Sequence, residues 1–176
     1  MLRVDALAYR ILIKPMRQAN SRARSTGPIR IRRARESDLH AIDSLYGELK
    51  PDEYAGHAPT PAKMRAGFRR IARSRDHHLI VAEFDGKVVG TVHVLIFRHL
   101  GHGTRPSAII ENVIVTEAMR SHGIGEKMLE AARLIAVRER CYKLALTSRL
   151  YRKAAHRFYE RLGWKHLHKG FALSLE

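Results

Sequence analysis

The stretch from Glu111 to Gly125, ENVIVTEAMRSHGIG, constrains the fold more than any other part of the sequence. Its β-branched first half predicts a strand, and the apolar residues after Gly123 recur at helical spacing. A strand that passes through a tight turn directly into a helix presents the unpaired N–H groups of the helix N-terminus. Those groups and the helix dipole favour a phosphate. The sequence therefore predicts an anion-binding strand–turn–helix unit.

The turn itself has the residues that a phosphate loop needs: Arg120, Ser121, His122, Gly123, Ile124 and Gly125. Glycines at 123 and 125 allow the backbone to turn with its N–H groups outward, and Arg120 adds a charged donor for phosphate oxygens. An ordinary strand-to-helix turn would also tolerate two glycines. The prediction of a phosphate loop therefore rests on the preceding strand and on the three-residue offset from Arg120 to Gly123.

The remaining pattern alternates strands with helices. Expected strands cover residues 29–34, 78–84, 88–97, 107–116, 142–147, 164–168 and 171–175. Expected helices begin after Ser37, Thr60 and Gly123, and the last one ends at Gly163. Asp85-Gly86 predicts a tight hairpin, and the strand–helix–strand unit at 107–148 predicts one parallel pair. We expect an α/β fold with a mixed sheet of six to seven strands and helices on both faces.

Composition limits the class of protein. The 176 residues are 45% hydrophobic, which suits one compact domain over residues 28–176. Residues 1–27 form a basic extension, for which a transit peptide, a misplaced start and a packed arm all remain open. Cys141 is the single cysteine, which excludes an internal disulfide and a cysteine-based metal site. No apolar run approaches the roughly 18 residues of a membrane helix. We expect a soluble, cytoplasmic protein with no membrane partner, and leave a homodimer open.

The net charge of +16 predicts anionic partners. A basic field attracts phosphates, carboxylates and nucleic acid, and it disfavours strongly cationic molecules such as polyamines. A solvated basic surface without a specific partner would have the same charge. Nucleic acid is therefore an alternative partner rather than the first expectation.

Several segments, in their order and spacing, resemble one known family. The R-x-x-G-x-G turn after a V-x-V strand is similar to the acetyl-CoA pyrophosphate loop of GNAT N-acetyltransferases. The opening IRIRRARESDL, the hairpin VAEFDGKVVG and the closing HRFYERLGW occur where that family has similar segments. The resemblance covers about residues 29–176. It implies the GNAT fold, with the parallel strand pair at the cofactor cleft, acetyl-CoA as co-substrate, and no metal.

Within the family, IENVIV, ERCYKLAL and FYERLGW are similar to glucosamine-phosphate N-acetyltransferases and related small bacterial members. Those enzymes tend to have an Asp after the Glu and another in the strand after CYK, whereas Asn112 and Thr147 stand here. We expect acetyl transfer to a primary amine of a small, anionic acceptor. Acetylation of an aminoacyl-tRNA or a protein amine is an alternative, and so is a CoA-binding module without turnover.

Two residues are candidates for the chemistry. Glu111 would accept the ammonium proton, directly or through water, because it lies on an apolar strand on the same face as Val113 and Val115, and a carboxylate in apolar surroundings is a stronger base. The family also has an acidic residue at this point. By resemblance, Tyr159 would protonate the departing thiolate. A buried, ion-paired carboxylate and a packing aromatic are the structural alternatives.

The resemblance also implies the rest of the cofactor contacts. The backbone of Val113, Ile114 and Val115 would pair with the pantetheine amides, and Arg152 and His156 would contact CoA from the face that carries Tyr159. The family often has Asn where Arg152 stands. The eleven histidines include close pairs, but none comes with a carboxylate or cysteine at ligand spacing, so we expect no metal site.

Overall fold

A computed structural model describes residues 28–49, 54, 56–167, 170–173 and 175. The basic extension expected at residues 1–27 lies outside this part of the chain. The described residues divide into two compact units, one ending at Thr147 and the other beginning at Ser148, and each is described by itself.

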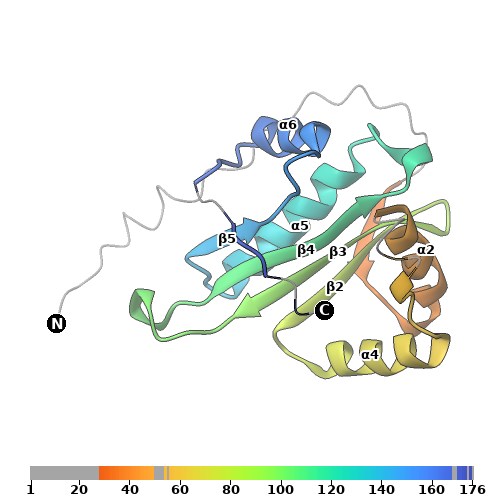
Figure 1. Ribbon diagram of the computed structural model, residues 1–176, viewed down its shortest axis with the longest axis horizontal. Coiled ribbons are helices and arrows are strands. Elements are labelled where there is room, and N and C mark those ends of the chain that lie inside the picture. Colours follow the sequence, from red (N-terminus) through yellow and green to blue (C-terminus); the bar gives the residue numbers. More distant parts are fainter. Residues whose placement is uncertain (1–27, 50–53, 55, 168–169, 174, 176) are drawn as a thin grey trace. The chain divides into compact units, whose positions relative to one another are not determined.

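The first unit is built on a five-stranded sheet (Figure 1). Its strands follow one another across the sheet in chain order: β1 Arg30–Arg33, β2 His77–Phe84, β3 Lys87–Phe97, β4 Ser107–Val115 and β5 Lys143–Leu146. The first four strands pair antiparallel, and β4 pairs with β5 in parallel. The mixed sheet and its one parallel pair are therefore as predicted.

The prediction of six to seven strands is wrong for the described residues. Residues 164–167 and 170–173 contain no strand, although their apolar residues alternate. Leu167, Phe171 and Leu173 are 72%, 96% and 86% exposed. Alternation describes which face a side chain would take, but a strand also needs a neighbouring backbone for its hydrogen bonds. The sequence pattern does not reveal whether that neighbour is present.

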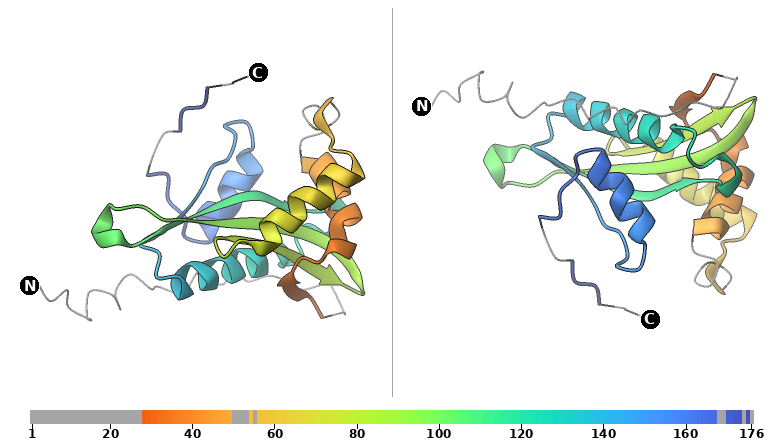
Figure 2. Two further views of the ribbon diagram at one scale, coloured as in Figure 1. Left: turned by 90° about the horizontal axis from the view of Figure 1, so that it is seen from below. Right: turned by 90° about the horizontal axis from the view of Figure 1, so that it is seen from above.

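Helices cover both faces of the sheet, as predicted. These are α2 Leu39–Leu49, α4 Pro61–Arg73 and α5 Ile124–Arg138, with short 3-10 turns η1 Glu36–Asp38, η2 His102–Thr104 and η3 Glu117–Met119. Figure 2 shows α5 on one face and α2 with α4 on the other. The second unit contains α6 Lys153–Arg161.

The two faces have separate packing partners. Toward α2 and α4, a cluster forms around Ile42, Leu79 and Val81, with Met64, Phe68 and Ile71 packed on it. Toward α5, Met128 and Leu129 are fully buried. Because side chains alternate along β2, neighbouring residues serve opposite faces, so one strand contributes to both cores.

The helix starts differ in how well the sequence predicted them. Thr60 caps α4 as expected, since its Oγ1 accepts from the Lys63 N–H at 3.4 Å. Ser37 does not cap α2, because it lies inside the 3-10 turn η1. There the Asp38 carboxylate accepts from the Arg35 N–H at 2.7 Å. This acidic side chain ends up 6% exposed, which its sequence position did not indicate.

Asp38 belongs to an ion-paired group that ties β1 to β2. Arg32 donates two hydrogen bonds to the Asp38 carboxylate, at 2.6 and 2.9 Å, and one to Glu83 at 2.7 Å. The Arg32 hydrogen bonds hold the pKa of Asp38 below its usual value, against the opposing effect of burial. These charged side chains are largely removed from water. Removing any one of them would therefore leave a buried charge without its partner.

Candidate active site

The fourth strand loses its parallel neighbour halfway along. β5 pairs with Ser107 to Ile110 of β4 and with no later residue. On its other side β4 remains paired with β3 as far as Val115. Among the described strands, none pairs with the β5-side edge of residues 111–115. That edge therefore presents backbone groups with which an extended molecule could form strand-like hydrogen bonds.

A bulge marks the point where the two strands part. Asn112 has a φ of 52°, and the register with β3 shifts here, so that Glu111 lies opposite His93 whereas Ile114 lies opposite Thr91. Because paired residues share a face, Glu111 and Ile114 lie on one face and Val115, opposite Gly90, lies on the other. The prediction that Glu111, Val113 and Val115 share a face is therefore wrong beyond the bulge.

Helix α2 supports the bulged segment. The Tyr46 hydroxyl hydrogen-bonds the Asn112 side chain; burial raises the pKa of this phenol, and the hydrogen bond opposes that rise. Farther along, the Glu48 carboxylate accepts from the Thr116 hydroxyl at 2.9 Å and from the Glu117 N–H at 3.1 Å. These contacts fix both ends of the unpaired edge from the side of α2.

The predicted phosphate loop is formed by a compact turn that ends in α5. Ser121 and Gly123 both have positive φ, 65° and 75°, and Ile124 is buried at 1% exposure. The expectation of two turn glycines is half right, because Gly125 is already the second residue of α5 and Ser121 makes the other left-handed turn. The first-turn N–H groups of α5 have no acceptor within the helix.

Side chains at the loop are held by backbone oxygens. Arg120 Nε donates to the Val115 carbonyl at 3.2 Å, and His122 Nδ1 lies 2.8 Å from the Arg120 carbonyl. Arg120 and Ser121 are exposed. The loop thus combines one accessible guanidinium with a helix N-terminus, which suits a phosphate group.

Glu111 does not have the apolar surroundings that were predicted for it, because its side chain is exposed. Its neighbour across the sheet is His93, whose Nε2 lies 2.9 Å from His77 Nδ1. Burial lowers the pKa of His93 to about 4, and the nearby His77 and His78 act in the same direction. His93 is therefore neutral at neutral pH.

The second unit contains three predicted site residues. Arg152 precedes α6, and His156 and Tyr159 lie on it. His156 Nε2 lies 3.0 Å from the Arg149 carbonyl, and the Tyr159 ring contacts Trp164 with centroids 6.1 Å apart. Burial raises the pKa of the Tyr159 phenol. A phenol with a raised pKa stays protonated, as a general acid must.

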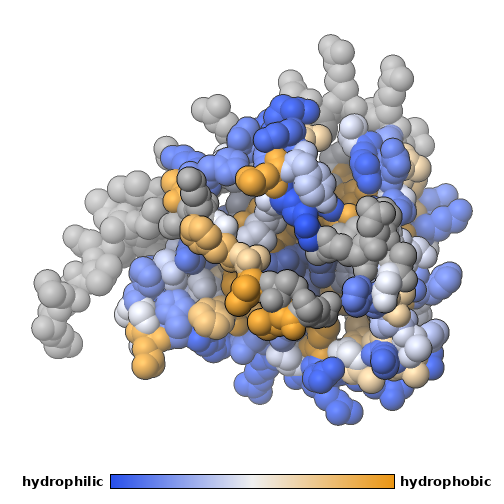
Figure 3. Space-filling model, viewed as in Figure 1, coloured by the Kyte–Doolittle hydropathy of each residue, from blue (hydrophilic) through white to orange (hydrophobic). Residues whose placement is uncertain are grey.

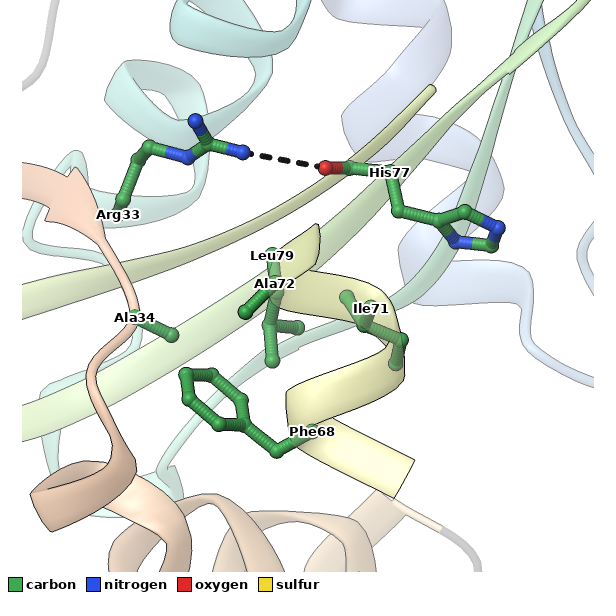
Figure 4. A pocket seen from close by; sticks show the side chains of 7 residues that line it. All are labelled: Arg33, Ala34, Phe68, Ile71, Ala72, His77 and Leu79. Atoms are coloured by element: carbon green, nitrogen blue, oxygen red, sulfur yellow. Dashed lines mark hydrogen bonds between the residues drawn. The ribbon is translucent and has the colours of Figure 1, made fainter. Parts of the chain in front are cut away.

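A cavity of about 230 Å³ lies between β1, β2 and the end of α4 (Figure 4). Phe68, Ile71 and Leu79 supply apolar side chains to its lining, and Arg33 and His77 supply polar groups. One Arg33 guanidinium nitrogen donates to the His77 carbonyl at 3.3 Å. His77 therefore lines this cavity and also contacts His93.

The described residues contain no group of three or more histidine, cysteine or acidic side chains placed to hold a metal ion. In that same part of the chain, no helix has the length and apolar character to cross a membrane.

Comparison with known proteins assigns the family. The sequence profile of the Acetyltransferase (GNAT) family matches residues 40–164. The chain belongs to this family. An aminoalkylphosphonate N-acetyltransferase from Salmonella typhimurium is 30% identical over 145 residues, which span 82% of this chain and 90% of the relative.

Solved structures agree with this assignment. A protein of Agrobacterium tumefaciens, assigned as an acetyltransferase, is 32% identical, with a TM-score of 0.75 over 82% of this chain and 99% of its own. Glucosamine-6-phosphate N-acetyltransferase from Arabidopsis thaliana is 24% identical, with a TM-score of 0.74 over 85% of this chain and 99% of its own. That second likeness concerns the fold alone. The predicted N-acetyltransferase class is confirmed, and enzymes of this family use acetyl-CoA.

The sequence did not predict several features of the site. Tyr46 appeared only as part of a helix, and no local pattern connected it with Asn112. Left-handed backbone at Asn112 and Ser121 is compatible with the residue types but is not required by them. The His77–His93 contact depends on the register of two strands, which alternation alone does not determine.

Proposed function

We propose that this protein transfers the acetyl group of acetyl-CoA to the primary amine of a small anionic acceptor of the aminoalkylphosphonate class. The observation that carries the proposal is the unpaired edge of β4 at residues 111–115, which leads through the short turn η3 into the left-handed turn before α5. An extended cofactor arm and a pyrophosphate need these two features in this order.

The cofactor would bind along that path. Its pyrophosphate lies on the loop from Arg120 to Gly125, and its pantetheine amides pair with the backbone of residues 113–115. A backbone N–H near Val113 polarises the thioester carbonyl. A preset donor of this kind is worth about 3–4 kcal/mol of transition-state stabilisation. Arg152 and His156 add contacts to CoA.

Proton transfer is assigned to Glu111 and Tyr159. Glu111 accepts a proton from the acceptor ammonium, directly or through water, and the free amine attacks the thioester carbonyl. The carbon–sulfur bond then breaks, the Tyr159 phenol gives its proton to the thiolate, and the resulting phenolate takes up the extra proton that the amide nitrogen loses. The exposure of Glu111 favours the route through water, and the raised pKa of Tyr159 supports its role as the acid.

The choice of acceptor is supported by similarity and charge together. The relative from Salmonella typhimurium acts on aminoalkylphosphonates, and this chain covers 90% of its length. The net charge of +16 favours an anionic acceptor over a cationic one.

Thiol release from acetyl-CoA tests the proposal. The acceptors are 2-aminoethylphosphonate, ethylamine (the same amine without the phosphonate), glucosamine 6-phosphate and a polyamine. We expect 2-aminoethylphosphonate to give the largest kcat/KM, and ethylamine to lose most of that value although its amine is the same. Equal rates with ethylamine would contradict the anionic acceptor, and release with none of the four would contradict small-molecule acetylation.

A further inference from the structure

The outer surface of α4 is the most one-sided concentration of charge among the described helices. Its sequence, PAKMRAGFRRIAR, contains no acidic residue. The cations are all exposed and together form what we call the α4 basic face: Lys63, Arg65, Arg69, Arg70 and Arg73. Figure 3 shows hydrophilic side chains along the edge where Figure 1 places α4.

This charge is only slightly neutralised within the described residues. Arg69 pairs with Glu36 at 3.2 Å, and both partners are largely exposed. The hydrogen bond from Arg69, and to a smaller extent the charge of Arg65, lower the pKa of Glu36. This one carboxylate thus partly neutralises two of the five cations, and Arg33, in the cavity beside the last turn of α4, adds a sixth cation. An exposed surface pair of this kind contributes little to folding, so the cations stay available to an outside anion.

The opposite side of α4 is already occupied. Met64, Phe68 and Ile71 recur at helical spacing and pack on the cluster around Leu79 and Val81. The helix therefore cannot turn its apolar stripe into a bilayer, and no large apolar side chain of α4 is exposed. The exposed face also has no aromatic ring on which an unpaired base could stack. A partner must be held by charge alone.

We propose that the α4 basic face binds the phosphate backbone of a double-stranded nucleic acid. Thirteen residues of helix span about 20 Å, and a duplex carries one phosphate per roughly 1.7 Å of its axis. A duplex lying along α4 therefore offers more phosphates than the face has cations. Guanidinium groups suit phosphate oxygens, and four of the five cations are arginines. This binding goes beyond acetylation of a small amine and does not depend on it.

Fluorescence anisotropy of the full chain with short RNA and DNA duplexes of one sequence, titrated with NaCl, tests the proposal. Four to five phosphate contacts predict a slope of log K against log salt of about −4, so a fourfold rise in salt weakens binding about 250-fold. The triple variant Lys63→Gln, Arg70→Gln, Arg73→Gln removes three contacts. Its slope should fall to about −1, which is about a fourfold weakening over the same range.

A matched control keeps the total charge equal. The variant Lys87→Gln, Arg140→Gln, Lys143→Gln removes three exposed cations that lie outside α4, and its slope should change by less than about 1. Preference for RNA or DNA in the wild-type titration identifies the kind of duplex. Equal losses of duplex affinity and of salt slope in both triple variants would show diffuse electrostatic attraction and overturn the proposal. So would absence of duplex binding, or α4-dependent binding to phosphatidylserine vesicles with none to either duplex.

Discussion

The β2–β3 side and the β4–β5 side of the sheet differ in how completely their strands pair. β2 pairs with β3 from His77 to Phe84, whereas β5 reaches only the first four residues of β4. The fully paired side also contains the ion-paired group around Arg32 and the packed helix α4. The incompletely paired side contains the bulge at Asn112, the exposed Glu111 and the turn before α5. The paired side thus supplies stability, and the open side leaves its backbone available for a ligand.

The largest effect on stability is expected from Arg32→Ala on the paired side. Arg32 and Asp38 are 12% and 7% exposed, so removing the guanidinium leaves a carboxylate buried without its partner. The free energy of unfolding should fall by roughly 3–5 kcal/mol, measured by urea denaturation. Arg33→Ala removes a neighbouring exposed arginine and should cost less than about 1 kcal/mol. If both variants lost a similar, small amount of unfolding free energy, this would contradict a stabilising ion pair between Arg32 and Asp38.

The same group should give an acid-dependent stability. Because the pKa of Asp38 is depressed in the folded state, its contribution is complete above the unfolded pKa of about 3.9 and is lost as pH falls through the lower folded value. The stability difference between the wild type and Asp38→Asn should therefore shrink below about pH 4. A difference that stays constant down to the acid transition would contradict the ion pair.

A smaller effect is expected where the two sides meet. A Cβ at Gly90 of β3 would lie 2.9 Å from the Ile114 carbonyl oxygen and 3.1 Å from Met128 Sδ. Gly90→Ala should lower the free energy of unfolding by about 1–3 kcal/mol, since the backbone of β4 must move. At Gly67 in α4 a Cβ would meet nothing within 4 Å. Gly67→Ala should instead stabilise the protein by about 0.5–1 kcal/mol. Thermal unfolding checks that the two substitutions change the stability in opposite directions.

Two glycines with nearly equal φ angles can separate an effect on stability from an effect on cofactor binding. Gly86 in the β2–β3 turn has a φ of 71°, and Gly123 before α5 has a φ of 75°. Alanine at either position should cost about 1–2 kcal/mol of stability. Only Gly123→Ala should also raise the KM for acetyl-CoA. An equal rise in KM for Gly86→Ala would show that general destabilisation, not the loop, controls binding.

The smallest effect is expected at the support for the bulge. Tyr46→Phe removes the hydroxyl that contacts Asn112, and should cost about 0.5–1.5 kcal/mol in unfolding. It should also lower kcat without changing the KM for acetyl-CoA, because the proposed oxyanion donor near Val113 would shift. Tyr54→Phe, which loses a hydroxyl contact with Asp43 instead, is the control. A fall in kcat in both variants would contradict a specific role for Tyr46.

The sequence was sufficient where local chemistry decides the structure. Asp85-Gly86 predicted its hairpin, Thr60 its helix start, and the run from Arg120 to Gly125 the turn before α5. It was insufficient where a feature depends on a neighbour that the sequence does not specify. The exposure of Glu111 and the bulge at Asn112 depend on the register with β3, and whether the described residues 164–167 and 170–173 form strands depends on a pairing partner. The roles of Glu111, Tyr159 and the CoA contacts remain predictions.

Thiol release from acetyl-CoA with 2-aminoethylphosphonate, compared between the wild type, Glu111→Gln and Glu117→Gln, tests the central claim most directly. Glu111→Gln keeps the size of the side chain and removes the proposed proton acceptor at the start of the open edge. The account predicts that its kcat falls by about 10²–10⁴-fold with the KM for acetyl-CoA unchanged, and that the exposed Glu117 tolerates the same change. An unchanged kcat in Glu111→Gln, or an equal loss in both variants, would contradict the assignment of catalysis to this edge of β4.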